Sequence, residues 1–169
     1  MELESLNSLP HDEAVKALLQ CCGSKRWAND VAQSRPYPNL ETLIAKANDV
    51  WWSLQQDDWL EAFRSHPKIG EKKAADPVFD RSRQWSGQEQ AGIKEASRET
   101  VDALAALNWG YEQKFGFIFI ICATGKTSDE MLSALKQRLE NDAATELPTA
   151  AAEQSKITEL RLKKLLSSP

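Results

Sequence analysis

The sequence is poor in the residues from which disulfide frameworks and zinc sites are built. It has 169 residues but only three cysteines and two histidines. Cys21 and Cys22 are adjacent and Cys122 stands alone, which is an odd number without the Cys-x-x-Cys spacing of a zinc site. We therefore expect three reduced, partly buried thiols and no metal site.

The chain also lacks a long hydrophobic run and an excess of positive charge. Its longest apolar stretch, residues 115–123, is interrupted only by Gly116 and is too short to cross a bilayer. The amino-terminal segment is acidic, unlike the basic and then apolar pattern of an export signal. The net charge is −4 and no basic stripe stands out, which argues against nucleic acid as a partner. We expect an intracellular protein that binds neither membranes nor nucleic acids.

What is present is the composition of one folded domain. Hydrophobic residues make up 41% of the chain and charged residues 27%, a balance typical of globular rather than disordered proteins. The length is that of one domain, so residues 1–169 are expected to share a single core.

Hydrophobic residues recur at three- and four-residue steps along most of the chain, which is the period of an amphipathic helix. Such patterns cover residues 12–22, 24–32, 40–54, 57–65, 86–115, 128–139 and 148–166. Pro148 suits the first position of the last helix, and residues 67–85 read as a long ordered loop. The one strand-like run, residues 115–125, has no second strand to pair with, so we expect a buried extended or helical connector there. The sequence predicts an all-α, single-domain bundle of about seven or eight helices without a sheet.

Cap residues mark where several of these helices are expected to begin. Asn39 is placed to cap the helix that follows a Pro-rich bend. Ser86 with Glu89, and again Thr127 with Glu130, have the Ser/Thr-x-x-Glu form of a capping box. The sequence therefore predicts helices that start after Asn39, at Ser86 and after Thr127.

A nucleotide-binding loop is not expected, although one segment imitates its end. The run Gly125-Lys126-Thr127 matches the last residues of the phosphate-binding motif. The glycine that the motif requires five positions earlier is replaced by Ile120. We interpret the segment as a loop that leads into a capped helix.

His66 is a candidate for acid–base chemistry. Pro67 disfavours helical geometry at the preceding residue, so His66 should sit at the carboxyl end of a helix. The negative end of the helix dipole favours an imidazolium there, which suits a proton donor. The alternative interpretation is a surface histidine that caps the helix end.

Two further sets of residues are open to a structural or a functional interpretation. Ser86, Glu89 and Gln90 either form only a capping box or create an anion site at a helix amino terminus with Glu89 as an acid–base group. Arg161 lies four residues after Ile157, on the apolar side of the last helix. It therefore needs an anionic partner, which is either an internal carboxylate or a substrate carboxylate.

Four segments in this order resemble the family of 2-oxo-4-hydroxy-4-carboxy-5-ureidoimidazoline (OHCU) decarboxylases. They are HPKIG at 66–70, the Ser-x-x-Glu-Gln motif at 86–90, LNWGYEQKFGFIFIICATGKT at 107–127 and ITELRLKKL at 157–165. The resemblance covers nearly the whole chain and is greatest to the decarboxylase half of plant-type bifunctional allantoin synthase.

The resemblance implies an all-α homodimer that converts OHCU to (S)-allantoin and carbon dioxide without a metal or organic cofactor. It implies that His66, Glu89 and Arg161 are catalytic, with His66 as the principal group. The expected substrate-binding residues are Pro67, Gln90, Ile121, Cys122, Ala123, Thr124 and Gly125, together with Ser86 at the expected helix start.

The resemblance also bears on supply and location. Plant-type members continue into a transthyretin-like hydrolase domain that this sequence does not include, so a separate 5-hydroxyisourate hydrolase is expected to supply OHCU. Residues 166–169 differ from the Ser-Lys-Leu peroxisomal address of animal members, so we expect a cytoplasmic protein, with the peroxisome as the alternative. Two other functions stay open: a helical protein-interaction module without catalysis, and a lyase acting on another ureido or imidazoline acid.

Overall fold

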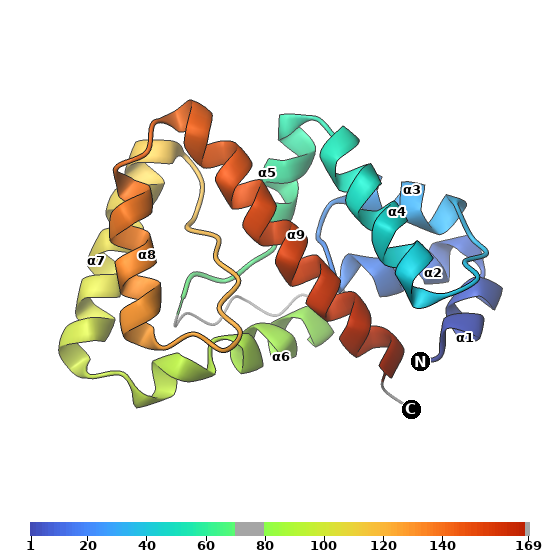
Figure 1. The fold of residues 1–169 in the computed structure, drawn as a ribbon, viewed down its shortest axis with the longest axis horizontal. Helices are drawn as coiled ribbons and strands as arrows, with labels where there is room; N and C mark the ends of the chain where they lie inside the picture. Colours follow the sequence, from blue (N-terminus) through green and yellow to red (C-terminus); the bar gives the residue numbers. More distant parts are fainter. Residues whose placement is uncertain (70–79, 168–169) are drawn as a thin grey trace.

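The computed structural model describes residues 1–69 and 80–167, and these residues form nine α-helices, one 3-10 helix and no strand (Figure 1). The helices are α1 (Leu3–Ser8), α2 (His11–Leu19), α3 (Lys25–Gln33), α4 (Leu40–Ser53), α5 (Gln56–Arg64), α6 (Asp80–Glu89), the 3-10 helix η2 (Ala91–Glu95), α7 (Arg98–Phe115), α8 (Ser128–Leu139) and α9 (Ala143–Ser167). The all-α prediction is confirmed. Helices α1 and α6 were not expected as separate elements, which raises the number above seven or eight.

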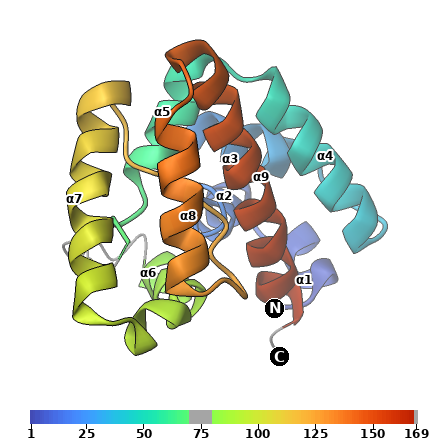
Figure 2. The same cartoon turned by 60° about the vertical axis from the view of Figure 1, so that its left-hand side comes forward.

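Helix α9 runs through the middle of the molecule and separates two groups of helices (Figures 1 and 2). One hydrophobic cluster joins α1–α5 to α9, with Trp27 and Leu162 fully buried in it. The indole of Trp51 donates a hydrogen bond to the carbonyl of Ala151 at 2.9 Å and so ties α4 to α9. A second cluster joins α7 and α8 around Tyr111. The site described below lies where these two clusters meet.

Two of the predicted helix starts are confirmed by their cap geometry. The Asn39 side chain accepts a hydrogen bond from the Thr42 amide at 2.8 Å at the start of α4. At α8, the Thr127 hydroxyl accepts from the Glu130 amide, and the Glu130 carboxylate accepts from the Thr127 amide, both at 3.1 Å. Each cap satisfies backbone amides that have no partner within the helix.

The predicted helix start at Ser86 is wrong. Ser86 and Glu89 lie in the last turns of α6, and α7 begins only at Arg98, where the Ser97 hydroxyl accepts from the Thr100 amide at 3.2 Å. Both side chains bond instead to the buried guanidinium of Arg161. A contact between distant segments therefore uses the groups that a capping box would have used, and the anion site at a helix amino terminus is not formed here.

Two further local predictions need correction. The expected loop over residues 67–85 gives way to α6 from Asp80 onward, and residues 70–79 lie outside the described residues. Pro148 is inside α9 rather than at its first position. The helix starts earlier because the Asp142 carboxylate accepts a hydrogen bond from the Thr145 amide at 2.8 Å and caps it.

A connector of residues 116–127 joins α7 to α8 and is neither helix nor strand, so the helical alternative for the predicted connector is wrong. Gly116 ends α7 with a φ of 81°, and Gly125 turns the chain toward α8 with a φ of 76°. Both values lie in the left-handed region that glycine adopts without a steric penalty. Between these turns, side chains point alternately to the two hydrophobic clusters: Ile120 and Cys122 to the first, Ile121 and Ala123 to the second.

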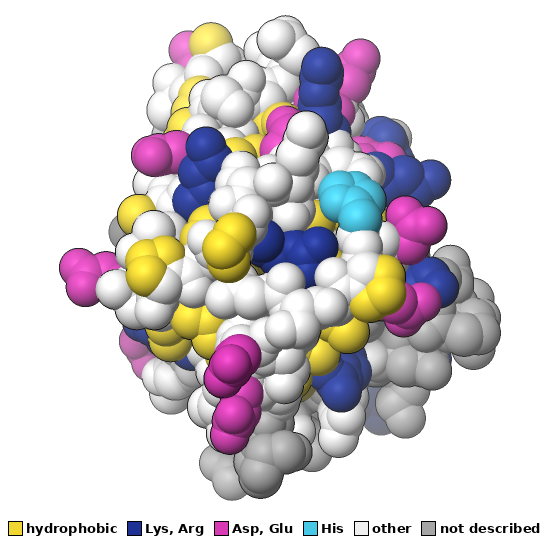
Figure 3. Space-filling view, turned by 90° about the vertical axis from the view of Figure 1, so that its right-hand side faces the viewer, with side chains coloured by type: hydrophobic (Ala, Val, Ile, Leu, Met, Phe, Trp, Pro, Cys, Tyr) yellow, Lys and Arg dark blue, Asp and Glu magenta, His cyan; other side chains and the backbone are white. Residues whose placement is uncertain are grey.

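The surface carries charges of both signs. On the face shown in Figure 3, lysine and arginine side chains are interspersed with aspartate and glutamate, and hydrophobic side chains form small patches. Within residues 1–69 and 80–167, none of the helices has the length and apolar character required to span a bilayer.

Candidate active site

His66 follows α5 and points into the protein. Its amide donates to the Phe63 carbonyl at 3.2 Å beyond the last turn, which confirms the predicted helix end. The residue is only 9% exposed. A surface histidine that merely caps the helix is therefore the wrong interpretation.

The side chain of Gln154 on α9 fixes the hydrogen bonding of His66. Its Oε1 lies 2.6 Å from His66 Nε2, and its Nε2 donates to the Thr158 hydroxyl at 3.0 Å. Because the amide nitrogen is already used toward Thr158, the amide oxygen faces the imidazole and accepts its Nε2–H. The neutral imidazole therefore carries its hydrogen on Nε2.

We expect the Gln154→Met substitution to loosen this arrangement. Methionine keeps a similar side-chain volume but offers no strong acceptor, so the tautomer of neutral His66 with hydrogen on Nε2 loses its specific partner. One neutral hydrogen bond corresponds to a change of roughly two- to tenfold in the tautomer ratio. Nitrogen-15 chemical shifts of the imidazole measure this ratio. An unchanged ratio in a folded variant would show that Gln154 does not set the tautomer.

Glu89 and Arg161 form a two-point ion pair behind the imidazole. Arg161 Nε lies 2.9 Å from Glu89 Oε1, and Arg161 Nη2 lies 3.0 Å from Glu89 Oε2. The side chains are 1% and 9% exposed, so the pair is almost completely buried. The sequence left two kinds of partner for Arg161, an internal carboxylate or a substrate carboxylate. In the structure, its partner is the internal carboxylate of Glu89.

The remaining donors of Arg161 bind α6 and the end of α2. Nη1 donates to the Ser82 hydroxyl at 3.0 Å and to the Gln20 carbonyl at 3.4 Å, and Nη2 donates to the Ser86 hydroxyl at 2.9 Å. Three residues of α6 are thereby attached to α9 through one guanidinium. Arg161 fixes the orientation of the helix that carries Glu89.

Glu89 remains ionised at neutral pH. Burial raises the pKa of its carboxyl group, but the hydrogen bonds and charge of Arg161 and the charge of His66 outweigh burial, so the pKa lies below its ordinary value. An ionised Glu89 does not donate a proton at neutral pH. It stabilises positive charge on its neighbour His66.

One cavity brings most of the expected site residues together. It has an empty volume of about 360 Å³, which includes open solvent. Its walls are formed by His66, Pro67, Ile69, Ser86, Glu89, Gln90, Phe119, Ile120, Ile121, Ala123 and Ile157. Segments from the end of α5, from α6, from the connector and from α9 thus meet around one cavity.

Four of the expected residues lie outside the cavity wall. Arg161 lies behind Glu89, and Cys122 points to the other side of the connector. Thr124 and Gly125 are exposed beyond the cavity.

The connector offers main-chain groups to the cavity. Ile121 is 8% exposed and Ala123 is 4% exposed. Among the described residues, the amide and carbonyl of Ile121 and the amide of Ala123 have no hydrogen-bond partner. Buried backbone groups are rarely left unpaired, so these groups are suited to a polar ligand in the cavity.

The arrangement can hold and protonate a small polar molecule. It combines an oriented imidazole, a neighbouring carboxylate, the Gln90 amide and main-chain donors and acceptors. Sequence reasoning missed Gln154, although a signal was present. Gln154 lies three and seven residues before Ile157 and Arg161, so it is a polar residue on the buried face of α9.

Comparisons with known proteins agree with one another. The sequence model of the OHCU decarboxylase family matches residues 7–163. The "Uric acid degradation bifunctional protein TTL" of Arabidopsis thaliana is 43% identical over 148 residues, which are 87% of this chain and 45% of that protein. The 2-oxo-4-hydroxy-4-carboxy-5-ureidoimidazoline decarboxylase of Amia calva is 30% identical over 175 residues and is covered over 97% of its length. The chain spans less than half of the Arabidopsis relative and 32% of the bifunctional protein of Bacillus sp. (strain TB-90).

Two solved structures are similar in fold. A crystal structure of OHCU decarboxylase in the presence of (S)-allantoin superposes with a TM-score of 0.78 at 41% sequence identity, covering 90% of this chain and 99% of the other. A crystal structure of (S)-allantoin synthase gives a TM-score of 0.72 at 19% identity, which is evidence for the fold alone.

Proposed function

The chain belongs to the OHCU decarboxylase family, and from this premise we propose that it converts OHCU to (S)-allantoin and carbon dioxide in urate breakdown. The observation that carries the proposal is the meeting of His66, Glu89 and Gln90 with the connector around one cavity. These residues come from segments far apart in the chain. They are the residues at which the motifs of the family resemblance are found.

The bond changes of the reaction determine which groups are needed. The carbon–carboxylate bond breaks, and its electron pair moves toward the ring C=N, so the substrate itself takes up the electrons. The ring nitrogen gains a proton as it takes up these electrons. The hydroxyl group then becomes a carbonyl as it loses its proton, and the carbon that bears the ureido group gains one. Overall, one proton is taken up for each carbon dioxide released. Protonation from one face makes the product a single enantiomer.

We assign the proton transfer to His66. Gln154 holds the imidazole by its Nε2–H, and the Glu89 carboxylate stabilises the imidazolium. Gln90 and the main chain of Ile121 and Ala123 are suited to binding the ring and ureido groups. In this proposal, Arg161 acts through Glu89 rather than on the substrate.

A coupled assay tests the proposal. Urate, urate oxidase and 5-hydroxyisourate hydrolase generate OHCU in solution, and circular dichroism follows the appearance of optically active allantoin. We expect the protein to accelerate this signal when it is added after the hydrolase. An unchanged signal would favour the helical interaction module or a lyase for another ureido acid.

We also propose a cytoplasmic homodimer that receives OHCU from a separate 5-hydroxyisourate hydrolase. Family resemblance supports the homodimer. Sedimentation velocity measures the assembly, and purified monomers at assay concentration would contradict it.

A further inference from the structure

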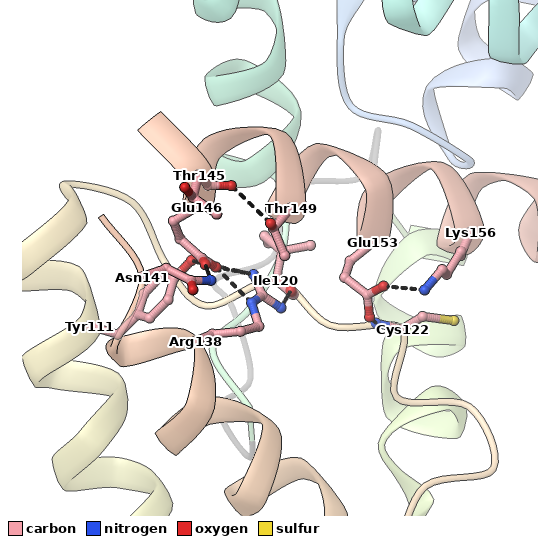
Figure 4. Close-up of polar contacts among 10 residues, drawn as sticks. All are labelled: Tyr111, Ile120, Cys122, Arg138, Asn141, Thr145, Glu146, Thr149, Glu153 and Lys156. Carbon is pink, nitrogen blue, oxygen red and sulfur yellow. Dashed lines mark hydrogen bonds and ion pairs between the residues drawn. The ribbon is translucent and has the colours of Figure 1, made fainter. Parts of the chain in front are cut away.

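The connector that lines the cavity is held by side chains that do not themselves line it (Figure 4). On α9, the Glu153 carboxylate accepts a hydrogen bond from the Cys122 amide at 3.2 Å. On α8, the Arg138 guanidinium donates to the Ile120 carbonyl. The two held residues flank Ile121, which lines the cavity.

The Arg138 contact is part of a buried network. Arg138 Nε donates to Glu146 at 2.6 Å, and the Tyr111 hydroxyl and the Asn141 amide also donate to this carboxylate. Glu146 is fully buried and Arg138 is 9% exposed. Figure 4 shows the network reaching the connector from α7, α8 and α9. A fully satisfied buried network of this kind holds its members in one geometry.

The pattern of bonds along the connector explains why these contacts concern the cavity. In an extended segment, the N–H and C=O of one residue point the same way, and those of the next residue point the opposite way. The carbonyl of Ile120 and the amide of Cys122 bond to Arg138 and Glu153, which do not line the cavity. The groups of the intervening residue, Ile121, are thereby directed to the opposite side.

We propose that Glu153 and Arg138 are positioning residues for substrate binding. They fix the rotation of the connector, and with it the direction of the Ile121 peptide groups. This inference rests on the proposed function, because the groups so presented are those assigned to the ring and ureido atoms of OHCU. Without these two contacts, the peptide bonds on either side of Ile121 lose the partners that direct them.

Glu153 offers the cleaner test because its side chain lies at the edge of the buried region, 13% exposed. Glu153→Leu removes the acceptor, whereas Glu153→Gln retains an oxygen that accepts from the Cys122 amide. Lys156→Met is the matched control, since it breaks the 2.6 Å Lys156–Glu153 ion pair and leaves the bond to Cys122 intact.

The expected results separate positioning from general destabilisation. Glu153→Leu should raise KM for OHCU roughly five- to tenfold, the equivalent of about one lost hydrogen bond, with a smaller change in kcat. Glu153→Gln should recover most of the affinity, and Lys156→Met should match the wild type. Amide hydrogen exchange at Cys122 should accelerate in Glu153→Leu alone, and the melting temperatures report any loss of folding.

Two outcomes overturn the inference in different ways. If the wild type is active and Glu153→Leu keeps its KM while Cys122 exchange accelerates, the positioning role fails and the proposed function stands. If the wild type does not act on OHCU, the proposed function fails and the positioning role fails with it.

Discussion

The His66→Asn variant should lose turnover of OHCU by roughly a hundred- to ten-thousand-fold, which is the usual contribution of a positioned acid–base group. Asparagine is polar and fits the space of the imidazole, but it does not titrate near neutral pH. The variant should therefore fold and leave the cavity intact. The coupled circular dichroism assay measures the rate, and thermal unfolding measures the stability.

Two controls isolate proton transfer from hydrogen bonding. His66→Gln carries an amide donor that is long enough to reach Gln154, so it retains the contact and lacks only the titrating nitrogen. It should be as inactive as His66→Asn. His11 is the other histidine of the chain; it is exposed on α2 and bonds to Asn29, so His11→Asn should behave as the wild type. Wild-type turnover in either His66 variant would refute the assignment.

The sequence predicted the helices whose ends are decided by neighbouring residues. Asn39 caps α4 and Thr127 with Glu130 caps α8 as expected, because both caps bond to amides only three residues away. Ser86 and Glu89 have the same spacing, yet they bond to a guanidinium more than 70 residues further along the chain. A local pattern contains no information about such a partner.

The functional residues divide in the same way. The position of His66 followed from the proline after it, and that of Arg161 followed from the period of α9. Gln154 was also detectable as a polar residue on the buried face of that helix. The contacts of Arg138 and Glu153 were not detectable from the sequence, because charged residues on helices usually face solvent. Their partners here are main-chain groups of the connector, whose path the sequence does not reveal.

The second large effect concerns stability and comes from the buried ion pair. Arg161→Met leaves the Glu89 carboxylate buried without its counter-charge and removes the donors to Ser82 and Ser86. Breaking a buried pair in this way costs about 3–5 kcal/mol of unfolding free energy. Urea denaturation at neutral pH measures the loss. A variant as stable as the wild type would show that the pair does not hold α6 in place.

The double variant Arg161→Met, Glu89→Leu tests whether the pair is kept for stability or for chemistry. Apolar residues of similar volume in place of a buried pair are often neutral or stabilising. The double variant should therefore recover most of the lost stability. It should nonetheless remain inactive, because the carboxylate that stabilises the His66 imidazolium is gone. Recovered activity would remove Glu89 from the mechanism.

The pH dependence of the unfolding free energy is an independent test of the Glu89–Arg161 pair. In the wild type, the folded-state pKa of Glu89 lies below its ordinary value of 4.5, so its stabilising contribution is present above pH 4.5 and is lost as the pH falls through the folded value. In Arg161→Met, burial without the guanidinium raises the pKa of Glu89 instead. Lowering the pH toward 4.5 therefore protonates Glu89 and raises the unfolding free energy of the variant. The difference in unfolding free energy between the two proteins should therefore shrink between pH 7 and pH 4. A constant difference over that range would mean that the cost of Arg161→Met arises from lost packing rather than from the unpaired charge of Glu89.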